Sequence, residues 1–209
     1  MKPGRRKQSD DSATRNALIE ATQALLLEEG YAAVSSRRIG ERAGVKPPLI
    51  HYYFATMDDL YLAVFRHAQE ISDDDYRAVL GSERPLSALW AFSDDPRSKL
   101  GAELVALANH RPALREEMVA YGEQAREAQV AALQRHFDRK GLKPGIPPVV
   151  AAVLLSSLSH QMRMEKSLGI SRGHEETLAY FEQWLELFDV TGAAPSGLDI
   201  STSSDCKSD

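Results

Sequence analysis

Three polar and aromatic residues, Lys46, His51 and Tyr52, lie in a stretch that fits two short helices joined by a turn. Ile50 and Tyr53 make the inward face of the second predicted helix, so we expect His51 and Tyr52 to point away from the core. Side chains of these types specify DNA sequence by hydrogen bonds to base edges or by apolar contact with thymine methyl groups. The spacing therefore predicts recognition of a nucleic acid rather than covalent chemistry.

The elements that must position these side chains form a helix-turn-helix pattern over residues 35–54, SSRRIGERAGVKPPLIHYYF. Gly40 is small where the two helices cross closely, and Gly44 falls where the turn requires a positive φ. Pro47 and Pro48 fit only the first turn of a helix, so the second helix is expected to start near Pro47 and to end at Tyr53. Ser35 or Ser36 is expected to cap the first helix, and the predicted inner face is Ile39, Ala43 and Ile50.

The charge of the chain is uneven. The 209 residues carry a formal net charge of −5, yet residues 30–54 contain four bases and a single acid, Glu41. Positive charge on a short motif in an acidic protein favours a nucleic-acid contact confined to one end. The only cysteine is Cys206, so no disulfide can form within one chain, and neither a signal peptide nor a membrane span is apparent. These features predict a cytoplasmic protein.

The rest of the chain is predicted to be helical, because no segment shows the alternation typical of strands. We expect an all-α fold with a flexible basic arm at 1–11, a helix-turn-helix DNA-binding domain at 12–56, a helical regulatory and dimerisation domain at 57–190, and a disordered tail at 191–209. Thr56 is expected to cap a connector helix that starts at residue 57 and is apolar on two sides.

The order of a capped N-terminal helix, SSRRIGERAGVKPPLIHYYF and then ATMDDLYLAVF resembles the TetR family of transcriptional regulators over residues 14–65. The resemblance implies a helix-turn-helix domain followed by a helical ligand-binding and dimerisation domain. Two departures stand out: Met57 occupies a position where the family often has Lys, and Pro47–Pro48 lack amide donors that could bind phosphates. We expect Arg37 and Arg38 to replace that charge. The DNA-contacting residues implied by the match are Ser36, Lys46, Pro47, Pro48, His51, Tyr52 and Tyr53.

Two helices near the C-terminus, predicted at 148–168 and 175–188, are candidates for a dimer interface. One helix-turn-helix reads few base pairs, so such proteins commonly bind two-fold, palindromic operators as homodimers. Two helices from each subunit would form a four-helix bundle. The alternative is that the same side chains form the core of a single chain. The candidate residues are Ala152, Ser156 and Ser159 on the first helix and Phe181, Trp184 and Phe188 on the second.

A regulated DNA-binding protein needs a second site, and several large side chains between residues 90 and 162 fit an apolar cavity with a polar group to orient a ligand. Aromatic residues and methionines at helical spacing are also typical of an ordinary core. The candidate ligand-binding residues are Trp90, Phe92, Leu107, His110, Met118, Tyr121, Leu158 and Met162.

No glycine-rich phosphate loop, nucleophile elbow or HExxH motif is present, so we predict neither an enzyme nor a cofactor or metal site. Two alternatives remain: a helical adaptor that uses the helix-turn-helix only structurally, and a metal sensor on the same scaffold. The favoured interpretation is a homodimeric repressor that a small, largely apolar ligand releases from DNA.

Overall fold

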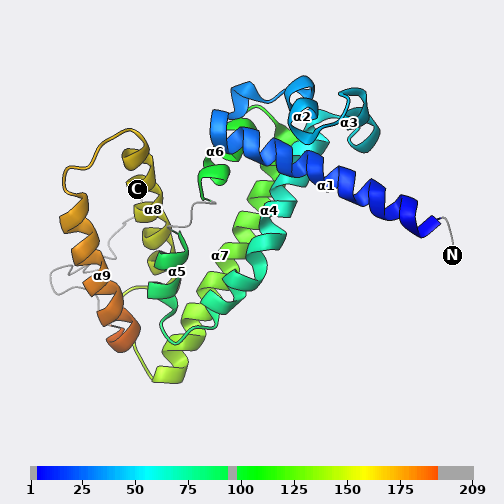
Figure 1. Cartoon of the computed structure of the whole chain (residues 1–209). Coiled ribbons are helices and arrows are strands. Elements are labelled where there is room, and N and C mark those ends of the chain that lie inside the picture. The colour runs from blue at the N-terminus through cyan, green and yellow to red at the C-terminus, as the bar shows by residue number, and fades with distance from the viewer. Residues whose placement is uncertain (1–3, 94–97, 193–209) are drawn as a thin grey trace, which may run out of the picture. The chain divides into compact units, whose positions relative to one another are not determined.

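A computed structural model describes the backbone of residues 4–93 and 98–192 and the side chains of residues 11–92 and 99–192. Within these ranges the chain is helical and contains no strand, which confirms the predicted all-α fold (Figure 1). The elements are α1 (Gly4–Glu29), the 3-10 helix η1 (Tyr31–Ala33), α2 (Ser36–Ala43), α3 (Pro48–Tyr53), α4 (Met57–Leu80), α5 (Pro85–Ser93), α6 (Ser98–Ala108), α7 (Pro112–Lys140), α8 (Pro148–Ser167) and α9 (His174–Thr191).

The first helix differs most from the expected boundaries. Ser12 and Thr14 are residue types that cap helices and would fit a helix starting after the expected arm, but α1 begins at Gly4, so neither residue caps its start. Residues 4–11, expected as a flexible basic arm, are the first part of this helix. The basic side chains of the expected arm lie outside the described side chains. Of the disordered tail expected at 191–209, Thr191 is the last residue of α9 and Gly192 is its C-cap, and the residues from 193 onward lie outside the described residues.

The chain divides into two compact units. Unit 1 comprises residues 1–77 and 95–125, and unit 2 comprises residues 78–94 and 126–209. α4 and α7 each begin in unit 1 and end in unit 2, so a boundary at residue 57 alone does not describe the division. The domain limits of 12–56 and 57–190 remain a prediction.

The core of unit 1 is built from the inward faces of α1, α4, α6 and the start of α7 around the helix-turn-helix. α6 is joined to the end of α1 by polar contacts, because Lys99 Nζ donates to the Leu27 carbonyl at 2.6 Å and the Tyr31 amide donates to Glu103 Oε2 at 3.0 Å. The most deeply buried side chains of this core are Leu18, Leu26, Ile39, Ile50, Leu60, Val64 and Leu114.

Unit 2 consists of α5, α8, α9, the second half of α7 and the last residues of α4. Asp189 on α9 is buried and caps α5, because its carboxylate accepts hydrogen bonds from the amides of Leu86 and Ser87 at 3.1 and 3.0 Å. Its backbone carbonyl lies 2.8 Å from His136 Nε2. Since a carbonyl only accepts, Nε2 carries the proton of this buried imidazole. None of the described helices is long and apolar enough to cross a membrane.

Candidate nucleic-acid interface

The turn of the helix-turn-helix has the predicted geometry. Ser35 is the N-cap of α2, and its hydroxyl accepts a hydrogen bond from the Arg38 amide at 3.4 Å. Gly44 ends α2 in the left-handed region with φ of 69°. The Val45 amide donates to the Gly40 carbonyl at 2.9 Å, which closes the turn. The expectations for Ser35 and Gly44 are confirmed.

Gly40 lies at a close approach, as expected, although its near neighbours belong to the turn and not to the second helix. A Cβ atom added there would lie 2.8 Å from the Val45 carbonyl oxygen and 3.3 Å from the Pro47 nitrogen. Both atoms belong to the backbone, so neither can move away as a flexible side chain could. The packing of the turn against α2 therefore requires glycine.

The short helix α3 begins at Pro48 with Pro47 as its N-cap, as predicted, and ends at Tyr53. Ile50 is buried at 1% exposure, whereas Tyr52 is 72% exposed and His51 is exposed as well. Lys46, Pro47 and Pro48 are exposed at the start of α3. The structure therefore exposes five of the predicted contact residues, Lys46 and Pro47 just before α3 and Pro48, His51 and Tyr52 on it.

Tyr53 is placed differently from its neighbour. It is half-buried, and its hydroxyl donates to Asp11 Oδ1 on α1 at 3.1 Å. Desolvation raises the pKa of the Tyr53 hydroxyl, and the nearby Asp11 carboxylate acts in the same direction. The Tyr52 ring contacts the Tyr53 ring edge-on at a centroid distance of 5.0 Å. Tyr53 thus anchors α3 to α1 and supports the exposed ring of Tyr52.

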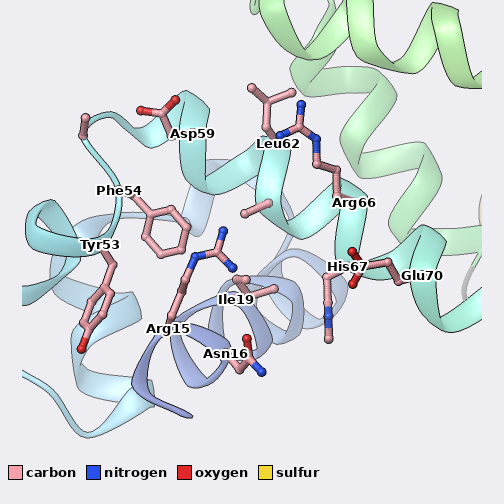
Figure 2. A pocket seen from close by; sticks show the side chains of 12 residues that line it. Arg15, Asn16, Ile19, Tyr53, Phe54, Asp59, Leu62, Arg66, His67 and Glu70 are labelled. Carbon is pink, nitrogen blue, oxygen red and sulfur yellow. The ribbon is translucent and has the colours of Figure 1, made fainter. Parts of the chain in front are cut away.

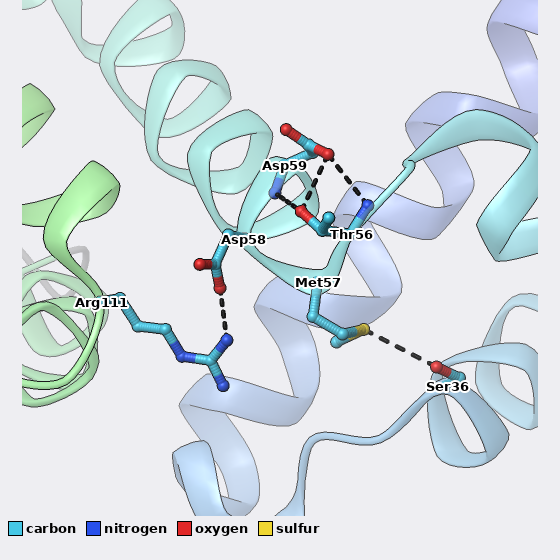
Figure 3. A network of polar contacts seen from close by, with 6 residues as sticks. All are labelled: Ser36, Thr56, Met57, Asp58, Asp59 and Arg111. Carbon is cyan, nitrogen blue, oxygen red and sulfur yellow. Dashed lines mark hydrogen bonds and ion pairs between the residues drawn. The ribbon is translucent and has the colours of Figure 1, made fainter.

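The first turn of α4 lies beside the start of α2 (Figure 3). Ser36 Oγ lies 3.7 Å from the sulfur of Met57, a contact in which the thioether is a weak acceptor. Thr56 and Asp59 cap the helix reciprocally, because the Asp59 amide donates to the Thr56 hydroxyl at 3.1 Å and the Thr56 amide donates to Asp59 Oδ2 at 2.9 Å. The predicted cap at Thr56 is confirmed, and Met57 contributes packing at a position where a lysine would contribute charge.

The arginines of α2 are largely held by carboxylates of the same chain. Arg38 is bound bidentately by Glu29, with both N–O distances at 2.6 Å, and Arg42 is bound by Glu28 at 2.7 and 2.5 Å. Arg37 pairs with Glu41 at 2.9 Å within α2 and stays 75% exposed. The hydrogen bond from Arg42 lowers the pKa of Glu28, and the bond to Glu29 raises the pKa of Arg38. Of the two predicted phosphate contacts, Arg37 is the more accessible.

These two bidentate pairs predict how the charge on α2 is masked. In the double variant Glu28→Gln with Glu29→Gln, Arg38 and Arg42 lose their ionic partners and can reach DNA phosphates. Each added phosphate contact steepens the slope of log K against log salt by about 0.9. We expect the slope to steepen by about one to two, measured by fluorescence anisotropy with a duplex. Glu20→Gln, an exposed change on α1, should leave the slope unchanged; an unchanged slope in the double variant would mean that these arginines do not face DNA.

A second contact joins the start of α4 to the segment before α7. The Arg111 guanidinium forms an ion pair with Asp58 (Figure 3). It also lies over the Tyr61 ring, at 5.5 Å from the ring centroid. Sequence reasoning missed this contact and the Glu28 and Glu29 pairs. The only signal for those pairs was two adjacent acids at the end of one helix and two arginines four residues apart in the next.

The predicted ligand-binding residues are divided between the units. Trp90, Phe92, Leu158 and Met162 belong to unit 2, whereas Leu107, His110, Met118 and Tyr121 belong to unit 1. In unit 1, Leu107 is core, and Tyr121 packs edge-on against Phe65 at 5.7 Å. His110 is exposed. In unit 2, Trp90 contacts Phe181 at 4.8 Å. The structure therefore does not gather the eight residues within either unit, and their role stays a prediction.

The predicted dimer residues are mostly core residues of a single chain. Ala152, Ser159, Trp184 and Phe188 are all buried within unit 2, which is the alternative that the sequence left open. Ser156 is half-buried and accepts a hydrogen bond from Arg126, and Phe181 is half-buried against Trp184. The exposed apolar side chains of the same two helices are Val149, Val150, Val153, Leu154, Met164, Tyr180, Leu187 and Val190.

The fold and the geometry of the motif define an all-helical protein of the helix-turn-helix class. Residues 18–64 match the family described as "Bacterial regulatory proteins, tetR family". The N-terminal segment of this chain therefore matches the DNA-binding segment of the TetR family.

Curated relatives also match part of this chain, and they are transcriptional regulators. The HTH-type transcriptional regulator PksA of Bacillus subtilis is 33% identical over 88 residues, which are 40% of this chain and 43% of that protein. The class A tetracycline repressor of transposon 1721, from Escherichia coli, is 33% identical over 96 residues, covering 41% of this chain and 44% of the repressor. These matches span less than half of the curated relatives.

The fold as a whole has solved counterparts. A structure from Saccharomonospora viridis, described as a transcriptional regulator in complex with choline, superposes with a TM-score of 0.71 at 19% identity. The superposition covers 85% of this chain and 95% of that chain. At this identity the likeness shows the fold alone. Within the described residues no group of three or more His, Cys, Asp or Glu side chains is arranged to hold a metal ion.

Proposed function

We propose that this protein is a transcriptional repressor that binds a two-fold DNA operator as a homodimer and is released by a small molecule bound in its C-terminal part. The observation that carries the proposal is the exposed surface made by His51 and Tyr52 on α3 and by Lys46 just before it, opposite the buried Ile50. The match of residues 18–64 to the TetR family supports DNA binding, and the tetracycline repressor among the relatives supports repression.

The contact set that we propose is narrower than the sequence implied. Lys46 and Arg37 are exposed and suit phosphates, and His51 and Tyr52 suit base edges. Arg38 and Tyr53 have partners within the chain, so we assign them to positioning α2 and α3. Pro47 and Pro48 lack amide hydrogens, so at the start of α3 they can contribute apolar contact but not backbone hydrogen bonds to phosphate.

Dimerisation is proposed on the outward faces of α8 and α9. Eight large apolar side chains of these helices are exposed in one described chain, and scattered exposure of this kind does not alone define an interface. Because these side chains lie on two helices that follow one another in the chain, they support a helix bundle formed with a second copy of the protein. Sedimentation of Leu154→Glu should give a monomer, whereas Val105→Glu, an exposed change on α6, should leave the wild-type mass.

A ligand site in unit 2 is supported by buried polar atoms that lack a partner. Among the described residues these atoms are Gln129 Oε1, His136 Nδ1 and Trp184 Nε1, all in unit 2. Leaving such groups unpaired costs roughly 1–3 kcal/mol each, so a molecule that hydrogen-bonds to them would gain affinity. Nε2 of His136 donates to the Asp189 carbonyl, so in a neutral imidazole Nδ1 is the acceptor and the complementary ligand has a donor.

Choline is the first probe for unit 2, because it has a hydroxyl donor and the neighbour from Saccharomonospora viridis was solved with it. Calorimetric titration should show binding that His136→Phe weakens about tenfold, by removing the acceptor. His160→Phe, an exposed histidine change on α8, serves as the matched control. Equal affinity in wild type and His136→Phe would remove His136 from the site.

The experiment that tests the proposed function is selection of binding sites from random duplexes by the full chain. A repressor of this kind should enrich a sequence with two inverted half-sites about one helical turn apart. A helical adaptor would enrich no sequence. A metal sensor would enrich a sequence only when a chelator is absent, or only when it is present.

A further inference from the structure

A hollow lies between α1 and α4 within unit 1, beside the end of α3 (Figure 2). Its volume is about 480 Å³, which falls within the range of roughly 300–1,000 Å³ of small-molecule sites. None of the eight residues predicted to bind the inducer lines it. The hollow is therefore separate from the ligand site proposed in unit 2.

Arg15 provides the cation of this hollow. Its guanidinium lies 5.0 Å from the centroid of the Phe54 ring and points into the space between Phe54 and Ile19 (Figure 2). Among the described residues Arg15 has no carboxylate partner. The other arginine of the lining, Arg66, is held by Glu117 at 2.7 and 3.0 Å. The planar fork of Arg15 is thus available for bidentate recognition of a carboxylate.

The walls of the hollow are apolar near Arg15 and acidic along α4. Ile19, Phe54 and Ala63 are 2%, 3% and 7% exposed and line the hollow with carbon. Asp59 is engaged in the cap of α4, whereas Glu70 is exposed and has no ionic partner among the described residues. The carboxylates of Asp59 and Glu70 disfavour binding of a ligand that carries only negative charge. They complement a ligand that also carries a positive charge.

We propose that the hollow binds a small amphipathic zwitterion. Its carboxylate pairs with Arg15, its apolar body packs against Phe54 and Ile19, and its ammonium group faces Glu70. Free amino acids with an apolar side chain have this chemistry. Because Phe54 ends α3 and Tyr53 also lines the hollow, the bound molecule fixes the joint between α3 and α4. This regulatory consequence rests on the proposed function, whereas the binding itself does not.

Calorimetric titration of the full chain with L-phenylalanine tests the site without DNA. Arg15→Gln should weaken binding about ten- to a hundred-fold, the loss expected for a charge-assisted pair, and Arg115→Gln on α7 should not. Benzoate and phenethylamine, which carry only one of the two charges, should bind at least about tenfold more weakly than L-phenylalanine. Glu70→Gln should lower affinity for L-phenylalanine but not for benzoate.

A methyl signal of Ala63, which lines the hollow, should shift on addition of L-phenylalanine, whereas that of Ala132 in unit 2 should not. Absence of binding at about 10 mM ligand, where even a weak millimolar site would be filled, would overturn the proposal. Equal affinity in wild type and Arg15→Gln would also overturn it, as would equal affinity for benzoate. If L-phenylalanine binds but the chain binds no DNA, the site stands and only its regulatory role fails.

Discussion

Tyr52→Ala is expected to lower affinity for the selected operator about ten- to a hundred-fold while leaving the fold intact. Tyr52 is 72% exposed on α3, so its side chain contributes little to the core. A good contact to a base edge is worth roughly 1–3 kcal/mol of discrimination, which corresponds to this loss. The loss should be largest for the selected sequence and small for a scrambled duplex, because Tyr52 is proposed to read bases.

Lys46→Ala is the companion change and should behave differently. A lysine that meets phosphate contributes to all sequences equally, so affinity should fall for selected and scrambled duplexes alike. The slope of log K against log salt should become shallower by about one. Matched controls are Val119→Ala, a 58% exposed side chain on α7, and Lys143→Ala in the loop between α7 and α8, neither of which should alter binding. Wild-type affinity in Tyr52→Ala and Lys46→Ala, measured by anisotropy, would refute the assigned surface.

Gly40→Ala is expected to give the second large effect, on stability. The new methyl group would meet the Val45 carbonyl oxygen at 2.8 Å, and overpacking of this kind costs roughly 1–3 kcal/mol. In a helix, alanine is more favourable than glycine by about 1 kcal/mol. The cost of the steric overlap must therefore exceed this gain for the substitution to destabilise the fold. We expect it to do so, because the opposing atoms are backbone. The free energy of unfolding should fall by about 1–2 kcal/mol.

Gly122→Ala on α7 is the matched control for Gly40→Ala. Nothing lies within 4 Å of a Cβ added there, so only the gain in helix propensity remains. Its free energy of unfolding should rise by up to about 1 kcal/mol. Urea denaturation followed by circular dichroism measures both variants. Equal changes in the two would contradict the close approach of the turn to α2.

The helix-turn-helix could be predicted in detail because its determinants are local in sequence. Gly40, Gly44 and Pro47 act within a few residues of their own positions, and Thr56 caps the helix that follows it directly. Contacts between distant residues could not be predicted in this way. Arg111 with Asp58, and Arg15 over Phe54, depend on how helices pack, and a single sequence carries no spacing that identifies them.

The C-terminal helices show a further limit of sequence patterns. Trp184 and Phe188 lie on an apolar helix face, and such a face predicts burial without saying whether the partner is the same chain or another. The structure buries both within one chain. Similarly, the apolar positions around residues 90 and 118 predict packing, but they do not reveal that α5 and the start of α7 belong to different units.

We propose that the exposed face of α3 reads DNA sequence. The most direct test of this proposal is the affinity of the full chain for the selected duplex and a scrambled one, measured between about 50 and 200 mM salt. We predict at least about a thousandfold preference for the selected duplex and a steep loss of affinity with salt, both characteristic of specific binding. Equal affinity for the two duplexes, or affinity independent of salt, would contradict the claim.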